Sequence, residues 1–163
     1  MQSVQLRHAF TMIELIFVII VIGILAMVAI PKFSSVENQA VISSGRATVM
    51  SVRAAISTLR QKGFMLGKSS YITSLDAGVA KNTSGVKIFD NNGTNNGTVS
   101  DTLLTYPIIT KNTSGGWMKT AKNQYTYYVG STPVIFTYNS NDGTFTCPTN
   151  NTPAGKDCAK LSQ

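Results

Sequence analysis

Side chains that could do chemistry are few in this chain, and they do not converge. The only histidine is His8, the two cysteines are Cys147 and Cys158, and Asp and Glu together number 7 in 163 residues. General acid–base or nucleophilic catalysis needs titratable groups that meet at one site. Serines are plentiful, but no candidate base accompanies them. We therefore expect a protein that is not an enzyme and that holds no cofactor and no metal. The alternative for a metal is a calcium site at Asp142 and Asp157, but calcium usually takes six to eight oxygen ligands, and little else near the C-terminus is acidic.

The two cysteines lie close together in the segment CPTNNTPAGKDC. A zinc site needs about four N or S ligands. A pair of cysteines that closes a short loop in a small domain is instead typical of a disulfide in an oxidising compartment. The sequence therefore predicts a Cys147–Cys158 disulfide that closes a C-terminal loop.

The acidic residue Glu14 raises a different question, because it stands near the start of a long apolar run. No charged side chain occurs from Leu15 to Ile30, and about 20 residues of apolar helix span the hydrocarbon core of a bilayer. A charge inside that core costs roughly 2.5 to 3.5 kcal/mol on insertion scales. The run is longer than the core of a cleaved secretory signal. We expect a retained membrane helix in which Glu14 needs a partner.

The residues around this run form a specific pattern. A short leader with Arg7 ends in the small residue Ala9, and the segment FTMIEL, the apolar run and Pro31 follow. The pattern resembles the N-terminal cleavage and methylation motif of type IV pilins and type II secretion pseudopilins. The resemblance implies that prepilin peptidase removes residues 1–9, cutting between Ala9 and Phe10 and methylating the new Phe10 amino group. The family usually has Gly where this chain has Ala9, and Ala is small enough that we still expect processing.

The resemblance also gives Glu14 a role in assembly. A buried carboxylate needs a cation, and cleavage would create an ammonium group on Phe10, four residues before Glu14. The resemblance implies that Glu14 of one subunit meets the Phe10 amine of its neighbour and sets the register of assembly, while residues 10–30 form the filament core. Pro31, which the motif also includes, is expected to kink the helix. The alternative is an uncleaved signal anchor that carries a Glu by chance.

Beyond Pro31 the sequence keeps a helical period. Small or apolar residues recur every three or four positions from Val41 to Leu59, which predicts an amphipathic helix half over residues 31–62 that ends at Gly63. Three arginines are spaced seven apart along one flank of this half, namely Arg46, Arg53 and Arg60. They could contact DNA or acidic groups of the next subunit, or their stems could cover the edge of the core while their heads stay in water.

Residues 63–163 are expected to form the globular head. The part from Phe64 to Lys122 is rich in Asn, Gly, Ser and Thr and predicts loops with one or two short strands or turns. The later segments QYTYYV, PVIFTY and GTFTC, separated by turn residues, predict an antiparallel sheet over about residues 124–147. These elements predict an α+β, pilin-like fold in which a long N-terminal helix, half transmembrane and half amphipathic, packs on a small antiparallel β-sheet head.

Several Asn-x-Ser/Thr triplets mark candidate glycan acceptors in the head. They start at Asn82, Asn92, Asn96, Asn112 and Asn150. Asn92 alone among them has an acidic residue, Asp90, two positions earlier. That spacing resembles the extended acceptor sequence of bacterial N-glycosylation, which makes Asn92 the candidate site. The alternative is that a chain this rich in Asn and Thr produces such triplets by chance.

The resemblance implies a structural subunit, pilin or pseudopilin, of a type IV pilus-like filament that polymerises through its hydrophobic N-terminal helix. The alternatives are a major or minor pseudopilin of a type II secretion system, a competence (DNA-uptake) pseudopilin, and a membrane-anchored binding module that does not polymerise. The implied partners are other pilin-like subunits in homo- and hetero-oligomers, prepilin peptidase, an inner-membrane assembly platform and the lipid bilayer before assembly, with DNA only for a competence filament. The implied location is the bacterial inner membrane, crossed once with the head in the periplasm, and then a periplasmic or extracellular filament.

Overall fold

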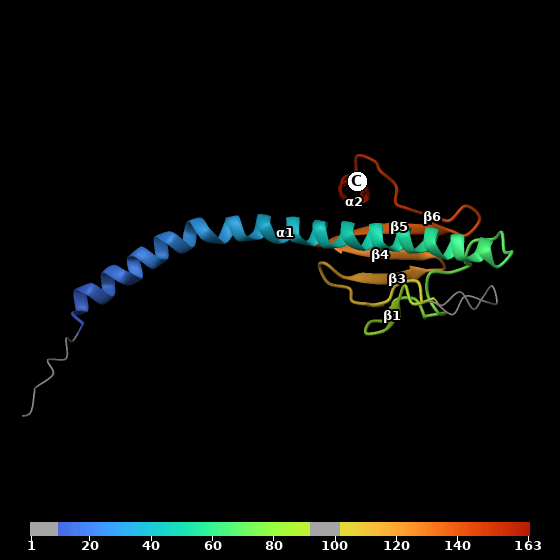
Figure 1. The fold of residues 1–163 in the computed structure, drawn as a ribbon. Helices are drawn as coiled ribbons and strands as arrows, with labels where there is room; N and C mark the ends of the chain where they lie inside the picture. The colour runs from blue at the N-terminus through green and yellow to red at the C-terminus, as the bar shows by residue number, and fades with distance from the viewer. Residues whose placement is uncertain (1–9, 92–101) are drawn as a thin grey trace, which may run out of the picture. The chain divides into compact units, whose positions relative to one another are not determined.

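The computed structural model describes residues 10–91 and 102–163 (Figure 1). It divides into two compact units, of which the first ends at Glu37 and the second is Asn38–Gln163. One helix, α1 (Met12–Met65), has residues in both units. In the described part of the second unit, short strands, a main antiparallel sheet and a second helix follow α1. This combination of elements confirms the predicted α+β fold.

Helix α1 ends at Met65, beyond the Gly63 that the sequence indicated as its end. The backbone of Gly67 has a φ of +72°, the left-handed conformation that glycine adopts at low cost. The Lys68 N–H donates to the Gly63 carbonyl (2.8 Å), and the Gly67 N–H donates to the Phe64 carbonyl (3.0 Å). This is the hydrogen-bond pair of a Schellman motif. Gly67 therefore ends the helix, and Gly63 lies within its last turn.

The main sheet of the head has four antiparallel strands in the order β3-β4-β5-β6. They are β3 (Trp117–Ala121), β4 (Gln124–Val129), β5 (Thr132–Asn139) and β6 (Thr144–Thr146). The sheet starts before the predicted residue 124. The sequence did not predict β3 because of Lys119, which lies opposite the buried Tyr125. Its charge stands at a position where the alternating pattern of a strand requires an apolar side chain.

Helix α1 packs an apolar stripe against one face of this sheet. The buried side chains of the stripe are Val49, Val52, Ile56 and Leu59. They share one core cluster with aromatic side chains of the sheet, namely Trp117, Tyr125, Tyr127, Phe136, Tyr138 and Phe145. Burial of each aliphatic side chain contributes about 1.5 to 3 kcal/mol. At the start of the stripe, Gly45 allows a close approach of α1 to the head, because a Cβ there would overlap the ring of Tyr127 and the side chain of Leu161.

In its described residues, the segment between α1 and β3 is mostly irregular, in line with the loops and short strands that the sequence indicated. It contains a two-stranded antiparallel sheet of β1 (Lys87–Ile88) and β2 (Ile108–Ile109). The same segment covers the edge of the main sheet, because the Asn82 N–H donates to the Lys119 carbonyl of β3 (2.7 Å). Exposed strand edges invite pairing with other chains, so this contact protects the β3 edge.

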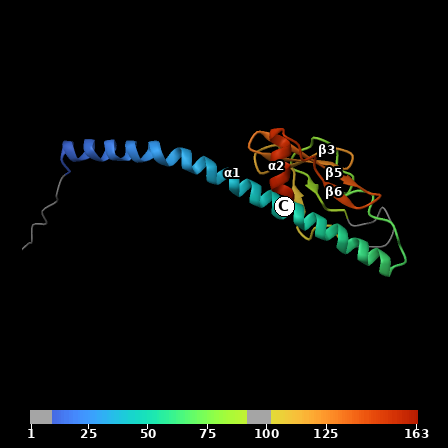
Figure 2. The same ribbon diagram turned by 90° about the horizontal axis from the view of Figure 1, so that it is seen from above.

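The C-terminal segment departs from the predicted loop, because most of it is helix α2 (Pro153–Ser162). The Thr152 hydroxyl accepts the Gly155 N–H (3.1 Å) as an N-cap, and Pro153 starts the helix. Thr at the N-cap and Pro in the first turn are start signals that the sequence does contain. Helix α2 contacts β5 (Figure 2) and buries Cys158. The C-terminal segment is therefore part of the folded head.

Candidate assembly segment

The first unit presents an apolar helix whose side chains are exposed. Its Met12–Ile30 part has a mean hydropathy of 3.1, and 0% of it is buried. Among the described residues this is the one helix long and apolar enough to cross a membrane, judged by length and composition. A continuous apolar surface of this size is unfavourable in water. The segment therefore needs lipid or other apolar helices around it.

Glu14 lies in the first turn of this helix with an exposed side chain. The hydroxyl of Thr11, which immediately precedes the helix, accepts the Glu14 N–H (3.3 Å). Thr11 and Glu14 have the Thr-x-x-Glu spacing of a capping box. A carboxylate in the first turn also interacts favourably with the helix dipole, typically by about 0.3 to 1 kcal/mol. The helix start offsets part of the cost of this charge, but not the roughly 2.5 to 3.5 kcal/mol that burial in a bilayer costs.

The other residues of the predicted processing and assembly motif lie at or near the same segment. Phe10 precedes the helix and is 82% exposed, whereas Ala9 lies outside the described residues. Position 31 lies inside α1, which is continuous through it, so Pro31 does not end the helix. Cleavage between Ala9 and Phe10, methylation of Phe10 and the assembly role of Glu14 stay predictions.

Two of the arginines on the flank of α1 bind carbonyl groups of the head itself. Arg46 Nε donates to the Lys160 carbonyl (2.9 Å). The Arg53 guanidinium donates to the carbonyls of Phe145 (3.0 Å) and Ser162 (3.3 Å). Lys160 and Ser162 belong to the last turn of α2, where carbonyls lack partners within the helix and cations are favoured. The two arginines thus cap α2 and hold it near α1.

The third arginine makes a different contact within the head. The Arg60 guanidinium lies 4.0 Å from the ring centroid of Phe64 and 4.4 Å from that of Tyr71, which is cation–π geometry. The guanidinium groups of all three arginines therefore make contacts within the head, which the sequence did not predict. The sequence could not show these contacts of the arginines, because the contacts depend on α2 and on loop residues such as Tyr71, whose positions were not predicted. Contact with DNA or with acidic groups of another subunit stays a prediction.

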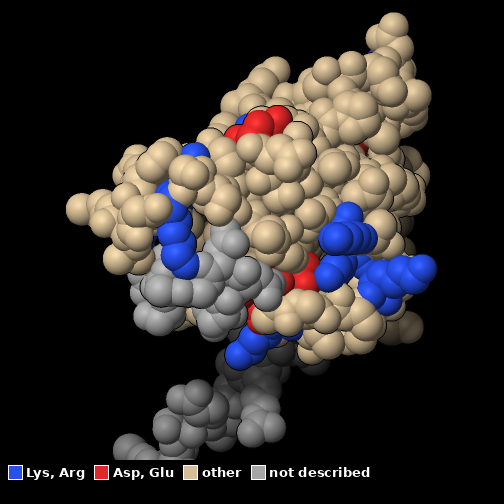
Figure 3. Space-filling view, turned by 90° about the vertical axis from the view of Figure 1, so that its right-hand side faces the viewer, with Lys and Arg blue, Asp and Glu red and all other residues tan. Residues whose placement is uncertain are grey.

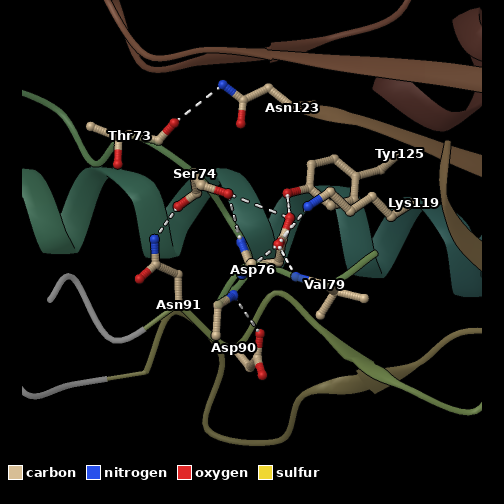
Figure 4. A network of polar contacts seen from close by, with 11 residues as sticks. Thr73, Ser74, Asp76, Val79, Asp90, Asn91, Lys119, Asn123 and Tyr125 are labelled. Atoms are coloured by element: carbon tan, nitrogen blue, oxygen red, sulfur yellow. Dashed lines mark hydrogen bonds and ion pairs between the residues drawn. The ribbon is translucent and has the colours of Figure 1, made fainter. Parts of the chain in front are cut away.

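A buried polar network, which no sequence pattern indicated, ties the segment after α1 to the main sheet (Figure 4). Asp76 is 0% exposed, and its Oδ1 lies 2.7 Å from Lys119 Nζ. The N–H groups of Gly78 and Val79 donate to the same oxygen (2.9 Å each), and the Tyr125 hydroxyl donates to Oδ2. A buried charge is tolerated when it is paired and hydrogen-bonded in this way.

The protonation states in this network follow from its contacts. Burial by itself raises the pKa of the Asp76 carboxyl, but hydrogen bonds from Lys119, Tyr125 and the Gly78 N–H, together with the Lys119 charge, outweigh burial and lower that pKa. Burial and the neighbouring Asp76 carboxylate raise the pKa of Tyr125 above its usual range. Asp76 is therefore ionised and Tyr125 protonated at neutral pH. Donors of this chain already occupy the carboxylate, so we interpret the network as a support for the head.

The two cysteines form the predicted disulfide, with the Cα atoms of Cys147 and Cys158 5.9 Å apart. The bridge joins the end of β6 to α2, so α2 is held by a covalent link as well as by Arg46 and Arg53. In the described ranges, no group of three or more His, Cys, Asp or Glu side chains could hold a metal ion. The candidate glycan acceptor Asn92 lies outside the described residues.

The fold and the exposed segment define an α+β protein whose head is carried by a helix suited to lipid or to other apolar helices. No family model matches the chain, and no solved structure matches it. Over 56 residues the chain is 45% identical to PilA5, the type IV narrow pilus major component of Thermus thermophilus. The match covers 33% of this chain and 48% of that protein, so the chain spans about half the length of the curated relative it matches. This similarity confirms the resemblance to type IV pilins that the sequence indicated.

Proposed function

We propose that the chain is a structural subunit of a type IV pilus-like filament, processed by prepilin peptidase and polymerised through its N-terminal helix. The observation that carries this proposal is the exposed apolar segment Met12–Ile30, with Glu14 in its first turn, in the same helix that packs on the sheet of the head. The similarity to a type IV pilus major component supports it. The role is structural, and we assign no cofactor and no catalytic residue.

The hydrophobic effect alone does not decide between the membrane and the filament. Each large apolar side chain gains about 1.5 to 3 kcal/mol when it leaves water, whether lipid or neighbouring helices surround it. Association of helices inside a membrane therefore depends on packing and on polar contacts. Glu14 is the one acidic residue in the segment 10–30. Among the side chains of this segment, the Glu14 carboxylate is therefore the group whose environment changes most between an isolated helix and a bundle.

The partner that we propose for Glu14 is the Phe10 amino group of a neighbouring subunit. Removal of residues 1–9 creates this ammonium group at the same end of the segment. Two unit charges about 4 Å apart attract by about 4 kcal/mol at an effective dielectric constant near 20. That gain is as large as the roughly 2.5 to 3.5 kcal/mol that the charge costs in a bilayer. Pairing would therefore favour the assembled state and fix the register of the subunits.

The location and the closest alternatives follow from the same segment. We propose that the chain crosses the bacterial inner membrane once, with the head in the periplasm, where the Cys147–Cys158 disulfide can form. An assembly platform would then transfer the chain from the membrane into a filament with other pilin-like subunits. A type II secretion pseudopilin and a competence pseudopilin would share the N-terminal helix. The disulfide-closed C-terminal segment favours a pilin. DNA would be a partner only of a competence filament.

Processing is tested on the protein purified from cells that contain the assembly machinery. Intact mass and N-terminal sequencing should show a chain that starts at N-methylated Phe10. The same mass spectrum tests the proposed glycan on Asn92, which would add mass to the peptide that contains it. A mature chain that still carries residues 1–9 would overturn the processing step. An Asn92 peptide found solely without added mass would remove the glycan and leave the filament proposal intact.

Assembly is tested by the variant Glu14→Gln, which keeps the shape of the side chain and removes its charge. We expect Glu14→Gln subunits to stay in the membrane, with filament yield reduced about tenfold or more, since a charge pair of several kcal/mol is lost. Glu37→Gln is the matched control, because Glu37 is an exposed glutamate of the same helix. Normal filaments from Glu14→Gln would sink the assembly role. Absence of crosslinks between N-terminal segments of the unaltered chain in cells would favour a binding module that does not polymerise.

A further inference from the structure

A cavity of about 310 Å³ opens at the point where the chain enters the head. It lies between the first turns of α1 that belong to the head, the turn that joins β4 to β5, and α2. The residues that line it include Asn38, Ile42, Ser131, Thr132, Asp157 and Lys160, and all of them belong to the second unit. Its volume is in the range of about 300 to 1,000 Å³ that is typical of small-molecule sites.

The cavity is polar and open to solvent. Lys160 Nζ lies 2.9 Å from Asp157 Oδ1, and the Lys160 side chain is 53% exposed. An ammonium group has three N–H donors, so the pair with Asp157 leaves donors of Lys160 for a ligand. Ser131 and Thr132 add side chains with hydroxyl groups to the lining, and Ser131 is exposed. The cavity can therefore donate several hydrogen bonds to one anionic group.

The charge around the cavity favours a ligand with one negative charge. Arg46 Nε donates to the Lys160 carbonyl (2.9 Å), which brings a second cation to the same turn of α2. Two cations, Arg46 and Lys160, thus stand against the carboxylate of Asp157. The exposed Glu37 precedes Asn38 in the sequence, but it is not among the residues that line the cavity. A phosphodiester carries one negative charge, and lysine binds phosphate through short, charge-assisted hydrogen bonds.

The place of the cavity along the chain brings it to the level of lipid headgroups when the chain is in the membrane. Glu14 marks the start of the apolar segment, and about 20 residues of helix cross the hydrocarbon core, so the core ends near position 34. Asn38 follows four residues later in the same helix, about 6 Å farther along its axis. The headgroup layer on each side of the core is about 5 to 7 Å thick. Asn38, at the edge of the cavity, therefore lies among the headgroups.

Positive charge alone does not single out this cavity. Lys and Arg side chains also gather on the side of the head where α1 ends (Figure 3). Met65, the last residue of α1, is about 40 Å along the helix from Asn38, well beyond the headgroup layer. A free anion in water would be attracted to both places. The phosphate of a lipid that stays in the bilayer can reach the cavity alone, and this difference decides between the two sources of phosphate.

We propose that the cavity binds the phosphate of a membrane lipid headgroup while the chain is in the membrane. This inference rests on the proposed passage of Met12–Ile30 through the bilayer, but not on filament formation. Lys160 and the hydroxyl groups of Ser131 and Thr132 donate to the phosphate oxygens, and the amide of Asn38 bonds the polar group esterified to the phosphate. The bound lipid holds the head against the bilayer, and its release accompanies transfer of the chain into the filament.

Lipid binding is tested by native mass spectrometry of the full chain in dodecyl maltoside micelles, a detergent without charge or phosphate. The probes are dioleoyl phosphatidylglycerol, dioleoylglycerol, which has the same chains without the phosphate, and inorganic phosphate in large excess as a competitor. Lys160→Gln removes the cation, and Lys156→Gln is its control, an exposed lysine of α2 that does not line the cavity. Ser131→Phe fills the cavity without changing any charge, and the exposed Ser84 gives the control Ser84→Phe. The fluorescence of Trp117, the sole tryptophan, reports whether each variant is folded.

We expect the unaltered chain and both controls to retain phosphatidylglycerol, and Lys160→Gln and Ser131→Phe to bind it about tenfold or more weakly, since charge-assisted hydrogen bonds to the phosphate are lost. Dioleoylglycerol should bind about tenfold more weakly than phosphatidylglycerol. Equal retention of the two lipids, or equal binding by the cavity variants and their controls, would overturn the proposal. Displacement of the lipid by inorganic phosphate would assign the cavity to a free phosphate instead. Failure of processing or of filament formation would leave this assay unaffected, because it needs neither.

Discussion

Asp76→Asn should destabilise the head strongly, although the substitution changes a single oxygen to an amide nitrogen. The carboxylate of Asp76 is 0% exposed and accepts from Lys119, Tyr125, Gly78 and Val79. Asn can still accept the two backbone N–H groups on its remaining oxygen. It cannot balance the charge of Lys119, whose side chain is 13% exposed. The variant therefore leaves a largely buried ammonium group without its counter-ion.

The size of the effect follows from that unpaired cation. Removal of one partner of a buried ion pair typically costs about 3 to 5 kcal/mol, and we expect the low end, about 3 kcal/mol, because Asn keeps two of the hydrogen bonds. For a head of this size, 1 kcal/mol corresponds to a shift in melting temperature of roughly 3 to 4 °C. The expected drop is therefore about 10 °C. The measurement is thermal unfolding of the full chain in detergent micelles, followed by the fluorescence of buried Trp117.

The pH dependence gives an independent check of the same reasoning. The pKa of Asp76 is lowered in the folded head from a reference value of 3.8, so its ionisation contributes stability above about pH 3.8 and that contribution is lost as pH falls through the folded-state pKa. The difference in unfolding free energy between the unaltered chain and Asp76→Asn should be constant from about pH 7 to pH 5. It should shrink below about pH 3.8, because the unaltered chain then loses the ion pair as well.

Two comparisons decide whether the ion pair is the cause. Asp142→Asn is the control, because Asp142 is exposed and its pKa is lowered chiefly by hydrogen bonds from Thr144, so we expect a clearly smaller loss of stability. The double variant Asp76→Asn with Lys119→Met removes both charges and should recover part of the stability that Asp76→Asn loses. A loss below about 1 kcal/mol in Asp76→Asn, or a difference that does not shrink in acid, would refute the argument.

Two further predictions concern the docking of α2. Replacing Cys147 and Cys158 together by serine should lower the unfolding free energy by about 2 to 4 kcal/mol, because the bridge closes a loop with a sequence separation of 11. Urea denaturation of the oxidised chain and of the serine-substituted chain measures the difference, and equal midpoints would contradict the prediction. Gly45→Ala should cost about 1 to 3 kcal/mol by overpacking, because the new methyl group meets the Tyr127 ring and Leu161. Gly23→Ala is its control, since nothing lies within 4 Å of a Cβ there, and a Gly45→Ala variant as stable as Gly23→Ala would show that α1 can move away from the sheet at no cost.

The sequence was informative wherever a local pattern had one physical explanation. The alternation of aromatic and β-branched residues in QYTYYV and PVIFTY predicted β4 and β5, since that period suits a half-buried strand. The paired cysteines predicted the disulfide. The apolar run predicted a helix of membrane length, because no other structure buries such a run so simply. Each of these inferences needed only residues within one segment.

The sequence was uninformative where two distant segments had to meet. Asp76 lies in the segment between α1 and β3, and its partner Lys119 lies in β3 itself. No local pattern marks either residue. Arg46 and Arg53 of α1 bind the end of α2, so their role could be predicted only after helix α2 had been predicted. Thr152 and Pro153 did signal that helix, but the pattern of two cysteines around a polar segment favoured a loop. Long-range polar contacts are therefore the part of this head that sequence reasoning misses.

Charge pairing separates the two parts of the chain. Within the described part of the head, the buried carboxylate Asp76 has its cation in Lys119, and the unpaired carbonyls at the end of α2 have theirs in Arg46 and Arg53. Glu14 is different, because the contact described at its end of α1 is the cap from Thr11 to its backbone N–H, which does not neutralise the side chain. A carboxylate on a helix of membrane length keeps its charge at low cost only with a cation beside it. We propose that this cation comes from cleavage before Phe10, from a neighbouring copy, or from both, and processing and assembly are therefore best tested through Glu14.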